Sequence, residues 1–196
     1  MIGKNLFRFI MSLGLALLIL ISGTQVLAGS DRVTRGDVEG AFRSWNGGLR
    51  ALRFISGVVA AAPTDGFQRG AIHPLLSDGK HYCSKDWHVV VAGWITGGDQ
   101  SFTYQDAVAN LSGIENAFIL DGVTLSITQT SIVRRVAAGA FEEEYGYIVG
   151  SILSPSDLSV GEHTLTWLAS FDGGPLEELT TITFYVDAAG TSACVR

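Results

Sequence analysis

The chain lacks the short motifs that mark several large classes of enzyme. It has no G-x-S-x-G elbow, no phosphate-binding loop, no G-x-G-x-x-G turn, no H-E-x-x-H pair and no C-x-x-C pair. Each absence excludes only the families whose chemistry needs that motif. The sequence therefore assigns no catalytic, cofactor-binding or metal-ligating residue, and we expect a protein that is not an enzyme.

Basic side chains are scarce over most of the chain. Residues 71–196 hold five basic and fifteen acidic side chains, a net charge of -10, whereas residues 29–70 hold six arginines against four acidic residues, a net charge of +2. Binding to nucleic acid or to anionic lipid depends on Lys and Arg side chains that neutralise negative charge. The acidic part is therefore a poor candidate for either partner, and its charge favours solubility.

Cysteine occurs only at Cys83 and Cys194. The first lies just before the first clear strand pattern and the second just after the last, and in an exported chain such a pair is expected to form a disulfide. The bridge would close a loop of about 110 residues, for which the chain-entropy model gives roughly 4 to 5 kcal/mol of stabilisation. The alternative is two free thiols.

The N-terminus has the pattern of a secretory signal. Lys4 and Arg8 precede an apolar run over residues 9–21, and a small-x-small sequence follows at residues 26–28. We expect residues 1–28 to be removed, leaving a secreted or extracytoplasmic chain that is not embedded in a membrane. The alternative is an uncleaved anchor, although the apolar run is short for a spanning helix. No cysteine lies near the predicted cleavage site to accept a lipid.

Residues 29–80 form a predicted N-terminal arm that is partly helical or disordered. Thr34 and Asp37 resemble a capping box, and apolar residues follow at helical spacing until glycines interrupt them: Val38, Phe42 and Trp45. These apolar side chains need burial, either on the rest of the protein or on a partner.

Residues 81–196 carry the alternating patterns of a β domain. The clearest is a hairpin whose turn lies at residues 172–175. The period of two predicts that these side chains face the core: Leu165, Trp167, Ala169, Phe171, Ile182, Phe184 and Val186.

Five further strands are predicted upstream, which gives about seven in total. They cover residues 87–95, 117–120, 123–128, 131–137 and 145–153. The first is apolar almost throughout, as expected of a central strand covered on both faces. Asp121 and Gly122 predict a tight hairpin, with Val123, Leu125 and Ile127 facing the core. Short helical segments are predicted at residues 103–111 and 154–157 from their capping residues.

The sequence LSPSDLSVGEHTL at residues 153–165, with the later strand TITFYVD, resembles the closing part of exported bacterial immunoglobulin-like domains. The resemblance spans roughly residues 87–186. It implies a mostly β, immunoglobulin-like antiparallel sandwich of about seven strands with one short helix, in a protein that acts as a spacer, adhesin or ligand-binding module. It brings no catalytic residues. The cysteines flank the whole domain, which departs from the Cys-Trp-Cys core of antibody domains.

The nearest approach to a chemical site is a cluster around His81, Cys83 and His88, with Ser84, Lys85 and Asp86 between them. It offers a metal site or a Ser-Lys nucleophile. A disulfide at Cys83 would remove the thiolate ligand, and adjacent residues of an extended chain point apart. The cluster therefore supplies the alternative hypothesis, a small secreted hydrolase or metal-dependent enzyme.

Three other patterns have simpler explanations. The acidic run at residues 142–144 suits a solvated loop better than a calcium site, because calcium needs oxygens from alternating loop positions. The tripeptide at residues 35–37 spells a cell-attachment motif that arises easily by chance, and Asn110 starts a glycosylation sequon that matters only in a cell with the machinery.

Aromatic side chains leave one route to function. Aromatics on a sandwich face can stack on sugar rings or fill a pocket of a partner, although the contexts of Trp45, Trp94, Trp167, Trp87 and Tyr82 favour packing in the core. We therefore expect a non-catalytic binding or structural module at the cell envelope or outside the cell. Its ligand would be a protein or a carbohydrate.

Overall fold

The computed structural model describes residues 32–39, 70–135, 142–191 and 194, and this part of the chain is mostly β. It contains a short helix over residues 35–39 and the helix α4 (Tyr104–Leu111). None of the described helices is long and apolar enough to cross a membrane. The predicted signal peptide, residues 1–28, lies outside the described residues, and so does Trp45.

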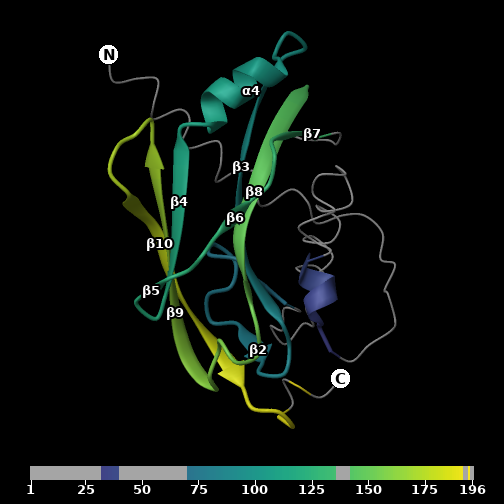
Figure 1. Cartoon of the computed structure of the whole chain (residues 1–196), viewed down its shortest axis with the longest axis vertical. Coiled ribbons are helices and arrows are strands. Elements are labelled where there is room, and N and C mark those ends of the chain that lie inside the picture. Colours follow the sequence, from purple (N-terminus) through teal and green to yellow (C-terminus); the bar gives the residue numbers. More distant parts are fainter. Residues whose placement is uncertain (1–31, 40–69, 136–141, 192–193, 195–196) are drawn as a thin grey trace.

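The strands form two sheets that face each other (Figure 1). Sheet A has the order β2 (His81–Cys83), β10 (Glu177–Asp187), β9 (Gly161–Phe171), β4 (Ile114–Leu120) and β5 (Val123–Thr124). Sheet B has the order β1 (Ala71–Ile72), β3 (His88–Gly98), β8 (Glu143–Leu153) and β6 (Thr128–Gln129), with β7 (Val133–Arg135) also paired to β8.

Most strand pairs are antiparallel, as the sequence predicts. The exceptions are two short strands at sheet edges, because β1 runs parallel to β3 and β2 runs parallel to β10. Both short strands lie before or at the start of the predicted sandwich, so the chain that leads into the domain completes one edge of each sheet. All five predicted upstream strands have a counterpart; β3, β4 and β8 are longer than expected, and β5 is shorter.

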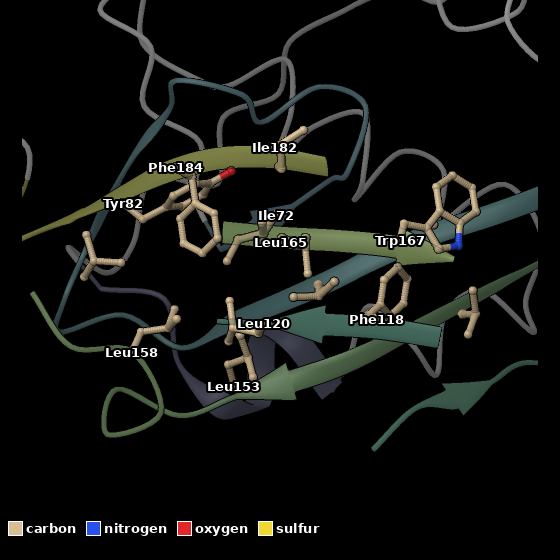
Figure 2. Packing of buried hydrophobic residues seen from close by; sticks show 14 of the residues in the cluster. Ile72, Tyr82, Phe118, Leu120, Leu153, Leu158, Leu165, Trp167, Ile182 and Phe184 are labelled. Carbon is tan, nitrogen blue, oxygen red and sulfur yellow. The ribbon is translucent and has the colours of Figure 1, made fainter. Parts of the chain in front are cut away.

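The core lies between the two sheets and consists of large apolar side chains (Figure 2). Leu165, Phe184 and Phe118 are fully buried there. The core side of the last hairpin is confirmed for Leu165, Trp167, Ala169, Ile182, Phe184 and Val186. Phe171 is the exception, because it ends β9 at the rim of the sandwich and is 41% exposed.

Both predicted capping boxes are present. Thr103 and Asp106 exchange hydrogen bonds at the start of α4. Thr34 and Asp37 do the same at the start of the helix over residues 35–39. Val38 is buried on the outer face of sheet B, so this part of the arm packs on the sandwich.

The strand predicted at residues 123–128 is wrong in its length and in its buried face. The Asp121-Gly122 turn forms with positive φ at both residues, but β5 ends at Thr124 because the chain then crosses from sheet A to β6 in sheet B. Val123 is 65% exposed and Ile127 is 38% exposed, while Leu125 packs against the core. The alternation therefore does not mark a core face here.

Candidate binding site at the free edge of strand β3

The two cysteines form a disulfide, as predicted. The Cα atoms of Cys83 and Cys194 are 5.1 Å apart and the bridge spans 111 residues of sequence. It ties the end of β2 to the segment that follows β10. Cys83 is therefore a cross-link in the fold and offers no thiolate to a ligand.

The structure gives His81 and His88 separate partners. The Nδ1 atom of His81 lies 3.1 and 3.2 Å from the two carboxylate oxygens of Asp187, and its ring stacks on Tyr185. His88 is only 1% exposed, and its Nε2 lies 3.1 Å from the carbonyl oxygen of Cys83. Among the described residues, no three His, Cys, Asp or Glu side chains are placed to hold a metal ion.

The residues between these histidines hold the fold together. Asp86 is 3% exposed and accepts a hydrogen bond from the backbone N–H of Val33, at 3.1 Å. The carbonyl of Lys85 accepts a hydrogen bond from Nε of Arg32, and the N–H of Ser84 donates to the carbonyl of Asp187. The contacts of Asp86 and Lys85 fasten the start of the helix over residues 35–39 to the loop between β2 and β3, and the contact of Ser84 fastens this loop to the end of β10.

The acidic run at residues 142–144 does not form one solvated loop. Glu142 accepts a hydrogen bond from the N–H of Gln100, and Glu143 pairs with Arg134 across neighbouring strands. The Arg134 guanidinium lowers the pKa of Glu143. Glu144 belongs to β8 and is 2% exposed, so the expectation of a solvated position is wrong there. Glu143 and Glu144 point to opposite faces because they are successive residues of β8, whereas Glu142 precedes that strand.

The other short patterns are also occupied within the fold. The guanidinium of Arg35 lies over the ring of Trp87, 5.6 Å from its centroid, and Asp37 belongs to the capping box. The side-chain amide of Asn110 donates to the hydroxyl of Thr96, at 3.1 Å. Neither the tripeptide at residues 35–37 nor the sequon therefore presents its polar groups without internal contacts.

A polar node that the sequence does not reveal joins the two sheets. The Oδ1 atom of Asn116 accepts hydrogen bonds from the indole N–H groups of Trp94 and Trp167, at 2.8 and 3.1 Å. Its Nδ2 donates to the hydroxyl of Tyr147, at 3.3 Å. Burial raises the pKa of Tyr147 to about 12. Both tryptophans therefore lie between the two sheets, in agreement with the prediction that Trp94 and Trp167 pack in the core.

The most unusual feature is the upper half of β3, which has a partner on one side only. On that side β8 pairs with all of β3, from His88 to Gly98. On the other side β1 pairs only with Val89 and Val90. Pro74 follows β1 closely within a turn in which the N–H of Ser77 donates to the carbonyl of His73, so β1 cannot continue along β3. Within the described ranges, no strand pairs with residues 91–98 on this side.

The direction of the backbone groups follows from one hydrogen bond. The N–H of Val89 donates to the carbonyl of Gly70, on the β1 side. Because backbone groups alternate in direction along a strand, those of Val91, Gly93, Ile95 and Gly97 point to the same side. Gly93 is exposed and Ile95 is 38% exposed. We call residues 91–98, on this side, the free edge of β3.

Within its own eight residues, the free edge has none of the protections that a strand sequence can supply. Sheet edges in soluble proteins are normally blunted by charged side chains, proline, bulges or short length. Residues 91–98 have the sequence VAGWITGG, with no charge and no proline, and β3 keeps one register with β8 throughout. The sequence predicts a central strand here, and β3 does lie between β1 and β8. Beyond Val90, however, the described residues pair with it on the β8 side only. The three glycines are the sequence feature that could have indicated this, because glycine within a strand often marks a site where another backbone approaches closely.

No protein-family model and no curated protein matches this chain.

Proposed function

We propose that the chain is an exported, non-catalytic β-sandwich of the immunoglobulin-like type that acts as a binding module at the cell envelope or outside the cell. We further propose that the free edge of β3 is its binding site. The observation that carries this proposal is an uncharged run of eight residues that is paired with β8 on one side. On its other side it has outward backbone groups and no strand partner among the described residues.

Two features support a location outside the cytoplasm. The N-terminal 28 residues have the pattern of a secretory signal. The disulfide between Cys83 and Cys194 suits an oxidising compartment, because thiols are kept reduced in most cytosols. The same bridge would stabilise an isolated domain that meets its partner outside the cell.

The physical reason for binding at this edge is the state of its backbone. N–H and C=O groups that point out of a sheet edge form a template for another strand, and many recognition domains bind extended peptides in this way. Main-chain hydrogen bonds give affinity, and alternate side chains give specificity. The exposed side chain of Ile95 lies within the edge and adds apolar area to such a contact.

The other hypotheses gain less from the geometry. A carbohydrate platform would use the faces of exposed aromatic rings, but the rings of Trp94 and Trp167 pack against each other, with their centroids 5.3 Å apart. A hydrolase or metal enzyme around His81 to His88 would need convergent groups, but each of these histidines has its own partner in the fold.

Site-directed photo-crosslinking in the producing cell tests the proposal. A photoreactive residue at Ile95 is expected to give a specific adduct, whereas one at Thr164, an exposed position on the outer face of sheet A, gives none. For a matched pair of variants, the photoreactive residue is moved to Gly97. With it there, Ile95→Pro should lose the adduct, because proline removes one outward N–H without breaking the β3–β8 ladder. The control Ile95→Thr, also with the photoreactive residue at Gly97, keeps that N–H and should keep the adduct. Equal adducts at Ile95 and Thr164, or none at Ile95, would refute the proposal.

A further inference from the structure

We infer that the occupant of the free edge is an extended segment of a partner protein that is apolar at alternate residues and carries Lys or Arg, and that it adds to sheet B as a new strand beside β3. This inference rests on the binding function proposed above. It is carried by three observations: the outward backbone groups, the apolar side chains beside the vacant strand position, and the charge around it.

The backbone sets the length of the occupant. The N–H of Val91 faces the carbonyl of Ile72 in the β1 ladder, so the outward groups that remain run from the Val91 carbonyl through Gly93 and Ile95 to Gly97. A paired segment of about eight residues would use all of them. At 3.3 Å per residue such a segment would extend about 26 Å. Neither a helix nor a small molecule can satisfy donors and acceptors spaced along that length.

The inner side of the new strand would face apolar side chains. Trp94 of β3 lies opposite β9, because its ring is 5.3 Å from Trp167 and 5.4 Å from Phe171. The vacant position beside β3 therefore lies opposite β10, the neighbour of β9 in sheet A. At this level of β10, Leu179 is half-buried, and Leu176, just before the strand, is 47% exposed.

The edge of β10 is also open at the same height. β2 pairs only with Tyr185 to Asp187, so in the described part of the chain residues 177–182 have β9 on one side and no strand on the other. In the part of the chain that the structure describes, both sheets thus end early on the same side of the sandwich. Inward apolar side chains of an added strand would cover Leu179 and the exposed ring of Phe171, which is why alternate residues of the occupant should be apolar.

Acidic groups lie at the upper end of this opening. Glu177 and Glu178 begin β10 and are exposed, and Asp99 follows the end of β3. Residues 71–196 as a whole hold fifteen acidic and five basic side chains. Opposite charge on the occupant would speed encounter and favour the correct partner, so we infer Lys or Arg near its ends.

Two other occupants are disfavoured. A second copy of this chain would present the same uncharged edge, residues 91–98, which carries no Lys or Arg to complement Glu177, Glu178 and Asp99. Among the described residues, no other segment of this chain covers Gly93 or Ile95. A separate partner segment is therefore the occupant that the exposure and the charge favour.

The test uses the full chain and three synthetic peptides. The probe is an eight-residue segment of alternating valine and threonine with two lysines at each end. The second peptide replaces the lysines by glutamates, and the third carries N-methyl groups on the residues that would pair with β3. Affinity is measured by calorimetry, and amide exchange at Gly93, Ile95 and Gly97 is followed by NMR in the same samples.

The lysine peptide should bind at least tenfold more tightly than the glutamate peptide and should protect the three amides, and the N-methylated peptide should not bind. Binding that survives N-methylation, without amide protection, would overturn strand addition while leaving the proposed binding function intact. Equal affinity of the lysine and glutamate peptides would overturn the inferred charge. Protection of the three amides before any peptide is added would overturn the inference in favour of an occupant from this chain, and sedimentation would then distinguish one copy from two. Failure of the photo-crosslinking test at Ile95 is a separate result that would refute the binding function itself.

Discussion

Acidification is expected to destabilise the sandwich through His88. This histidine is 1% exposed, and burial lowers its pKa from 6.5 to about 4, although the Cys83 carbonyl and the Asp86 charge partly oppose that shift. Its Nε2 faces the Cys83 carbonyl, and its Nδ1 has no hydrogen-bond partner among the described residues. The fold therefore holds the neutral ring and offers the added proton no acceptor.

The sign and the size follow from the two pKa values. The unfolded chain takes up a proton at His88 near pH 6.5, whereas the folded chain does so only near pH 4. The stability that the neutral ring contributes is present above pH 6.5 and is lost as the pH falls toward 4. A full loss corresponds to roughly 3 kcal/mol, and the loss by pH 5 corresponds to about 2 kcal/mol. Domains of this kind have total stabilities of about 5 to 15 kcal/mol, so the effect is measurable.

Urea unfolding followed by tryptophan fluorescence at pH 7, 6 and 5 measures this loss. The variant His88→Gln is uncharged at every pH, and its amide can still donate to the Cys83 carbonyl. Its free energy of unfolding should fall by about 2 kcal/mol less than that of the natural chain between pH 7 and 5. The control is His81→Gln, because the side chain of His81 is 44% exposed. Burial also lowers the pKa of His73 to about 4, so both variants keep some pH dependence.

Two results would refute this reasoning. If His88→Gln lost stability with acid as steeply as the natural chain, the buried ring would not be the source of the effect. If His81→Gln flattened the pH profile as much as His88→Gln, burial would not be the cause of the difference.

Three further predictions concern the fold. Replacing Cys83 and Cys194 by Ser should lower the free energy of unfolding by roughly 4 to 5 kcal/mol, measured by urea titration, and no change would mean that the bridge does not restrict the unfolded chain. Asn116→Ala should lower the unfolding free energy by about 2 to 4 kcal/mol, because two indole donors lose their acceptor. Asn116→Asp keeps the acceptor and should lose less stability. Equal losses in the two variants would contradict the role of that acceptor. Gly146→Ala should lower the unfolding free energy by about 1 to 3 kcal/mol, because the new Cβ would lie 2.6 Å from the carbonyl oxygen of Trp94. The loss is measured as a fall in Tm. An unchanged Tm would show that the sheet relaxes without strain.

The sequence predicts the local features of this fold well. The last hairpin, both capping boxes and the Asp121-Gly122 turn each depend on residues close together in the chain, and all are present. The disulfide could be predicted because only two cysteines exist and an exported chain favours their oxidation.

Features that depend on distant pairing could not be predicted in the same way. β1 has only two residues and β2 only three, so neither carries a periodic pattern, and both exist because a long neighbouring strand offers an edge. Periodicity also says which face of a strand is buried but not how many neighbours it has. The free edge of β3 therefore appears only once the extent of β1 is known.

The polar interior shows a similar limit. Asn116 lies in a strand of mixed character, and nothing in its sequence context indicates that two tryptophans from different sheets donate to it. Glu144 follows two other glutamates, so composition favours a solvated loop, but β8 begins before it and carries it into a buried position. In both cases the tertiary pairing decides the environment of the side chain.

Hydrogen exchange along β3 in the full chain, without any partner, tests the central claim most directly. If residues 91–98 form a free edge, the amides of Gly93, Ile95 and Gly97 should exchange quickly, while those of Ala92 and Trp94, which point toward β8, should exchange slowly. Slow exchange at both sets of amides would show that the edge is already paired, and it would contradict the assignment of this strand as the binding site.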